Sequence, residues 1–173
     1  MLEELLAGLN RHCLEFTTNE RSTWAYDHQQ IPAQDWTTWL ILGGRGAGTT
    51  RAGAEWVRDI ARDPAARIAL IGETEHDARE VMVEGISGLL AAHRHDEKPE
   101  WIPSCRQIEW KNGAVAQVFS AEDPESLRGP KFTAVWCDEL AKWRRADEAA
   151  PINAGRSPRE SLDNYATFTG FKS

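Results

Sequence analysis

Long apolar runs are absent from this sequence, and their absence excludes one class of protein. No stretch of the 173 residues approaches the roughly 18 consecutive apolar residues that a membrane-spanning helix needs. The first residues, Met1 to Leu6, are acidic where a secretory leader would be basic. We therefore expect a cytoplasmic protein without a membrane partner.

Cysteine and positive charge are also scarce. The three cysteines, Cys13, Cys105 and Cys137, lack the paired spacing of a disulfide framework or a zinc site. The net charge of −7 argues against a broad basic surface for nucleic acid, because such surfaces bind chiefly by neutralising phosphates. Contact with DNA at a few points, or only within an assembly, stays open.

What is present is an alternation of apolar runs and helical patterns. It predicts an α/β fold with a largely parallel central sheet. We expect strands at 38–42, 67–72 and 132–137, helices at 1–16, 50–62 and 74–93, and a hairpin of 106–111 and 114–120 around Asn112-Gly113. The expected organisation is a lead-in helix and segment over 1–36, a core over 37–145 and an irregular tail over 146–173.

A glycine-rich loop between a strand and a helix is the most informative segment. Backbone N–H groups in such a loop, together with a helix N-terminus, bind phosphate. The pattern G-x-x-x-x-G-K-[ST] places Gly43 first, Gly48 sixth and Thr50 as the magnesium-binding hydroxyl, but it requires lysine where this chain has Thr49. The expected cofactors are ATP and Mg²⁺, and the expected cofactor-binding residues of the loop are Gly43, Gly44, Arg45, Gly46, Ala47, Gly48, Thr49 and Thr50.

An acidic pair follows the last predicted strand. Asp138 would hold Mg²⁺ together with Thr50, and Glu139 would polarise the attacking water. Such a pair of acidic residues often only stabilises the N-terminus of a helix. Its position after a glycine loop favours the functional interpretation. Arg45 could stabilise phosphate charge or be a solvated loop residue. Arg128 could simply be a residue of a turn without a further role.

Histidine and tryptophan give no further site. His93 and His95 end a predicted helix among charged residues, so we expect them to be solvated rather than metal-binding. Trp101 and Trp110 could stack on bases, but packing in the core is the expectation that we favour.

Three collinear segments resemble the large terminase subunit of tailed phages, prophages and gene transfer agents. They are Leu40 to Trp56, Ala121 to Pro130, and Ala134 to Trp143 within a resemblance over roughly 20–145. The resemblance implies an ASCE-type P-loop ATPase, a three-layer sandwich that drives DNA into a procapsid. Its implied partners are double-stranded DNA within the assembled motor, the portal protein, the small terminase subunit and further copies in a ring.

Site roles follow from the same resemblance, residue by residue. Arg45, Thr50, Asp138 and Glu139 match the family position for position, with Glu139 and Arg45 catalytic and Thr50 and Asp138 binding the metal. Arg128 would be a nucleotide-sensing or intersubunit arginine. Gln29 or Gln30 lies where the family has a glutamine that contacts adenine.

Two departures from the family leave three functions open. Thr49 cannot supply the positive charge of the family's lysine, and residues 151–173 do not resemble the coupling motif or the nuclease that follow in the family, as if the chain were truncated or its tail aberrant. The hypotheses are a packaging ATPase impaired in hydrolysis, a module that binds nucleotide or a partner without hydrolysis, and a decayed prophage product.

Overall fold

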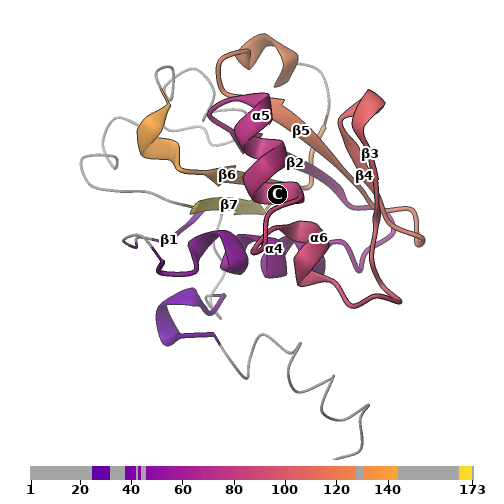
Figure 1. Ribbon diagram of the computed structural model, residues 1–173, viewed down its shortest axis with the longest axis horizontal. Coiled ribbons are helices and arrows are strands. Elements are labelled where there is room, and N and C mark those ends of the chain that lie inside the picture. The colour runs from indigo at the N-terminus through magenta and orange to yellow at the C-terminus, as the bar shows by residue number, and fades with distance from the viewer. Residues whose placement is uncertain are drawn as a thin grey trace, which may run out of the picture.

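One mixed sheet organises the part of the chain that can be described (Figure 1). The computed structural model describes residues 25–31, 38–41, 43, 46–127, 131–143 and 168–172. Within these residues the sheet has the order β1-β7-β6-β2-β5-β4-β3. Its strands are β1 (Thr38–Ile41), β2 (Arg67–Gly72), β3 (Glu100–Ile102), β4 (Gln107–Glu109), β5 (Val115–Ser120), β6 (Ala134–Asp138) and β7 (Phe168–Lys172).

The expectation of a largely parallel sheet holds only for its centre. Strand β2 pairs in parallel with β5 on one side and with β6 on the other. All other pairs among the described strands are antiparallel: β1 with β7, β6 with β7, β3 with β4, and β4 with β5. Since β1 and β6 both run opposite to β7, they run in the same direction. Their carboxyl ends therefore meet at the same edge of the sheet.

The prediction of an irregular tail over 146–173 is wrong for residues 168–172. Residues 168–172 form β7, which lies between β1 and β6 (Figure 1). Residues 168–172 form a short run that contains Gly170, which is a poor strand former, so their local pattern gives little strand signal. Their strand partners lie far away in the sequence. The helix expected over 1–16 lies outside the described residues.

The central strands are buried on both faces, as parallel strands usually are. In β2, Ile68 and Leu70 face one apolar cluster, and Ala69 and Ile71 face the other. Helices cover the first face: α4 (Thr49–Ile60), the π-type turn η2 (Ala78–Val83) and α6 (Leu89–Ala92). On the second face the described residues supply the 3-10 turns η4 (Pro124–Leu127) and η5 (Leu140–Lys142).

The single helix expected over 74–93 is broken into three pieces. Thr74 caps α5 (Glu75–Asp77) as predicted, by accepting a hydrogen bond from the Asp77 N–H. The chain then widens into η2, turns through Gly85 and Gly88, and begins again as α6. Glycine weakens a helix interior, and two of them within four residues end this one despite its apolar spacing. The hairpin of β4 and β5 around Asn112-Gly113 is confirmed.

Helix α4 packs very closely on β6 at one point. A Cβ atom added to Gly53 would lie 2.3 Å from Cε2 of Trp136, whose indole is fully buried. Only glycine allows this approach, because any larger side chain would enter the space of the ring. The contact sets the spacing between the helix that follows the glycine loop and the strand that carries Asp138.

We expect Gly53→Ala to lower the free energy of unfolding by about 1–3 kcal/mol, the usual cost of overpacking a core. Urea denaturation of the variant and the parent measures the difference. The double variant Gly53→Ala/Trp136→Leu, which makes room for the new methyl group, should lose less than the sum of the two single changes. Strict additivity would contradict the close contact.

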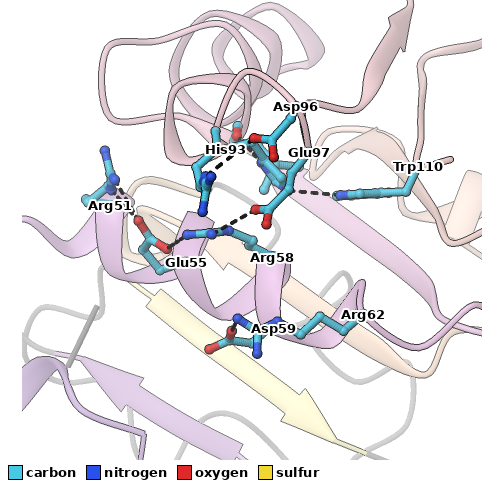
Figure 2. A network of polar contacts seen from close by, with 11 residues as sticks. Arg51, Glu55, Arg58, Asp59, Arg62, His93, Asp96, Glu97 and Trp110 are labelled. Atoms are coloured by element: carbon cyan, nitrogen blue, oxygen red, sulfur yellow. Dashed lines mark hydrogen bonds and ion pairs between the residues drawn. The ribbon is translucent and has the colours of Figure 1, made fainter. Parts of the chain in front are cut away.

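A buried polar network joins α4 to α6 and the hairpin (Figure 2). Arg58 is nearly buried and pairs with Glu55 at 3.2 Å and with Glu97 at 2.9 Å. His93 is buried too, which overturns the expectation of a solvated histidine. Its Nδ1 lies 2.7 Å from the Leu89 carbonyl, and its Nε2 accepts a 2.9 Å hydrogen bond from the indole of Trp110.

These contacts favour one neutral form of His93. Nδ1 carries the proton donated to Leu89, and Nε2 must stay unprotonated to accept from Trp110. Burial is the largest influence and lowers the pKa of His93, with Arg58 lowering it further against the opposing Leu89 carbonyl and the carboxylates of Glu55 and Glu97. The buried Trp110 confirms the packing role expected of that residue.

Stability should therefore fall in acid. Because the pKa of His93 is lower in the folded state than the ordinary histidine value of 6.5, the unfolded chain takes up this proton first as the pH falls. The contribution is intact above about pH 6.5 and is lost as the pH drops from there through the folded pKa. Denaturation midpoints between pH 7.5 and 5 measure it. His93→Gln, which can accept from Trp110 but does not titrate, should flatten the profile; an equally steep fall would contradict this assignment.

Candidate functional site

The glycine loop joins β1 to α4 at the edge where the parallel strands end. Among its described residues, Gly46 and Gly48 have positive φ angles of 78° and 72°, a conformation that side chains rarely adopt. Gly48 precedes the first turn of α4, and its carbonyl accepts from the Ala52 N–H. The expected helix and the described part of the expected strand, residues 38–41, are thus present on either side of the loop. Gly44 and Arg45 of the loop lie outside the described residues.

Asp138 lies at the end of β6 and meets the start of α4. Its side chain is almost fully buried, and the side chain of Thr50 lies close enough to its carboxylate to lower the carboxylate's pKa. The indole of Trp143 donates a 3.1 Å hydrogen bond to the Asp138 carbonyl and so holds the end of the strand. The structure therefore brings together the two residues that the sequence predicted as magnesium ligands.

The carboxylate of Asp138 is in an environment that favours a cation. Burial and the charge of Glu139 raise its pKa to about 7, against the lowering effects of hydrogen bonds with the Glu139 backbone and with Thr50. Its Oδ1 is buried without a hydrogen-bond partner. A buried anion with an unsatisfied oxygen is costly, and a hydroxyl and a carboxylate are oxygen ligands that Mg²⁺ accepts. The residues present therefore fit a divalent cation of this class.

Glu139 follows directly and has a different environment. Its backbone is left-handed with a φ of 50°, and its carboxylate is about half exposed. Lys142, one turn of η5 further on, forms an ion pair with that carboxylate. The acidic pair is thus split into one buried group beside Thr50 and one accessible group held by a lysine.

No cation of the loop helix replaces the missing lysine among the described residues. Thr49 is buried, and its Cγ2 methyl lies 3.2 Å from where a Cβ of Gly43 would be. Arg51 pairs with Glu55 at 2.6 Å, one turn further along α4 (Figure 2). This ion pair with Glu55 already engages the guanidinium of Arg51.

Gln29 makes a contact that the sequence did not predict. It ends the 3-10 turn η1 (Asp27–Gln29), is buried, and donates a 2.6 Å hydrogen bond from Nε2 to the Ala47 carbonyl in the glycine loop. Gln30, the other residue that the resemblance singled out, is exposed. No local pattern signals a contact between residues 18 positions apart.

The described residues bear only in part on the expectations for Arg128, for metal sites and for membrane-spanning helices. Arg128 lies outside the described residues, so its role remains a prediction. Within the described ranges no group of three or more histidine, cysteine or acidic side chains could hold a metal ion. No helix in those ranges is long and apolar enough to cross a bilayer.

Comparison with known families finds a match over most of the chain. The family model described as "Terminase large subunit, T4likevirus-type, N-terminal" matches residues 40–171. The match includes the glycine loop, the acidic pair and most of β7, and it extends well beyond residue 145, where the sequence resemblance was expected to end. No curated protein and no solved structure matched the chain.

Proposed function

Since the chain belongs to the terminase large-subunit family, in the part described as its N-terminal region, we propose that it is the P-loop ATPase domain of a phage-type DNA-packaging motor. The family supports a role in DNA packaging. The observation that carries the finer proposal is the proximity of Thr50, which follows the glycine loop, to the buried carboxylate of Asp138 at the end of β6. The parallel centre of the sheet is compatible with an ASCE-type fold.

In this proposal each described element of the site has a defined task. The backbone N–H groups of residues 46–50 hold the phosphates at the N-terminus of α4. Thr50 and Asp138 would hold Mg²⁺, which neutralises phosphate charge when it is bound. Glu139, which follows Asp138 directly, would orient the attacking water and accept its proton. Arg45 and Arg128 are proposed to stabilise phosphate charge, as the resemblance implies.

Thr49 argues for slow turnover within this function. Phosphoryl transfer depends on positive charge placed at the phosphates, and a hydroxyl cannot provide it. We propose that Mg-ATP binds weakly and is hydrolysed slowly or not at all. The same observation favours a second candidate, a domain that binds nucleotide and responds to it without hydrolysis. Because the family supports a role in DNA packaging, the proposed partners are DNA, the portal, the small terminase subunit and further copies of the chain.

Magnesium-dependent nucleotide binding tests the proposed site. Fluorescent ATP should bind the parent chain more tightly with Mg²⁺ than with EDTA, and Thr50→Val should remove that difference while leaving the EDTA value unchanged. Valine has the shape of threonine without the hydroxyl, so the change isolates the proposed ligand. Thr38→Val, an exposed β1 residue, is the matched control. Binding that is indifferent to Mg²⁺ in the parent would refute the proposal.

A further inference from the structure

The amide of Gln29 is fixed between its own turn and the glycine loop. Its Oε1 accepts a 3.1 Å hydrogen bond from the Tyr26 N–H. The backbone N–H of Gln29 closes the turn by donating a 2.8 Å hydrogen bond to the Tyr26 carbonyl. Its Nε2 donates to the Ala47 carbonyl at 2.6 Å. Only 8% of Gln29 is exposed, so these hydrogen bonds are largely shielded from competing water.

The contact constrains one peptide unit of the loop. In a trans peptide the carbonyl and the next N–H point in opposite directions. A hydrogen bond that holds the Ala47 carbonyl toward Gln29 therefore holds the Gly48 N–H toward the opposite side. Loops that bind phosphate do so with N–H groups, and turning a peptide over would present a carbonyl oxygen in place of that donor.

The fit at Gly48 shows that the two parts pack tightly. A Cβ atom added to Gly48 would lie 2.7 Å from Nε2 of Gln29. Gly48 also has the positive φ that the turn into α4 requires. The amide of Gln29 thus occupies the space next to the Cα atom of the sixth residue of the loop.

We propose that Gln29 is a positioning residue for the phosphate loop, which fixes the Ala47–Gly48 peptide in the orientation that accepts an anion. The proposal rests on the proposed function in that the loop binds a nucleotide phosphate chain. It differs from the adenine contact that the resemblance implies for a glutamine in this region. A residue that orients the loop contributes equally to every ligand with the same phosphates, whereas a residue that reads adenine contributes only to ATP.

Loop order in the absence of nucleotide tests the positioning role directly. In Gln29→Met, which keeps the length and removes the amide, we expect the backbone order parameters of Gly46 and Gly48 to fall from about 0.85 to below about 0.6. Gln29→Glu keeps the acceptor for Tyr26 and replaces the donor with an anionic oxygen that cannot bond the Ala47 carbonyl, so it should give the same result even if Gln29→Met disturbs η1. Gln30→Met, at the exposed neighbour, should leave both glycines unchanged. Unchanged order in the two Gln29 variants would overturn the proposal.

Ligand selectivity separates the two roles. We expect Gln29→Met to weaken Mg-ATP, Mg-GTP and magnesium tripolyphosphate by the same factor, about five- to tenfold for one lost hydrogen bond. A loss confined to ATP would assign Gln29 to adenine and overturn the proposal. If the parent binds none of the three ligands, the proposed function fails, and loop order in the free protein alone then decides whether Gln29 fixes the loop.

Discussion

Replacing Thr49 with lysine is expected to raise the affinity for Mg-ATP and the rate of its hydrolysis by roughly a hundredfold, because one well-placed charge in such a site is worth a few kcal/mol. Two described features support this expectation: Gly46 and Gly48 have positive φ angles, and Thr50 lies close to Asp138. Thr49 lies against Gly43, so the stem of a lysine would begin beside the first glycine of the loop.

Thr49→Met is the matched control for this substitution, because it adds length without charge. Calorimetric titration with Mg-ATP and a steady-state phosphate-release assay measure the two effects. Methionine should give no gain over the parent. A lysine variant that is equally inert would mean that the loop does not form a phosphate site, and the proposed function would be wrong.

Removing the carboxylate of Glu139 in the Thr49→Lys background should abolish most of the turnover. A positioned general base contributes about 10²–10⁴-fold, so Glu139→Gln should lower the hydrolysis rate by that order. Affinity for Mg-ATP should change little, because Glu139 is about half exposed and the buried contact to Thr50 belongs to Asp138. Single-turnover hydrolysis with labelled ATP separates the chemical step from binding.

The control for this change is Glu122→Gln, an exposed carboxylate outside the site, which should hydrolyse at the full rate of the Thr49→Lys protein. Lys142→Met is a second useful variant, since it removes the ion pair with Glu139 and leaves the carboxylate in place. Undiminished turnover in Glu139→Gln would remove Glu139 from the chemistry and leave the site as one that only binds.

Local signals in the sequence predicted the elements on which the site stands. The apolar run of β2, the Asn112-Gly113 hairpin and the helix after the glycine loop each depend on neighbouring residues, and the structure confirms all three. The order of a glycine loop and an acidic pair was enough to predict that Thr50 and Asp138 meet, because strands that run in one direction end at one edge.

The parts that sequence reasoning missed depend on residues far apart in the chain. His93 is buried because the indole of Trp110, 17 positions away, donates to it. The strand β7 forms because β1 and β6 lie on either side of it, and neither neighbour is visible in the local pattern of residues 168–172. The contact of Gln29 with Ala47 is of the same kind. Such features follow from tertiary packing, which overrides local propensity.

The measurement that tests the central claim most directly is calorimetric titration of Mg-ATP into the Thr49→Lys/Glu139→Gln protein, with and without Asp138→Asn. The first protein should bind without hydrolysing, which gives a clean equilibrium constant. Because Asp138 and Thr50 are proposed to hold the magnesium ion together, Asp138→Asn should weaken Mg-ATP by at least about tenfold and should not change the affinity for ATP in EDTA. Equal affinity for Mg-ATP in both proteins would contradict the assignment of this site as a magnesium-nucleotide site.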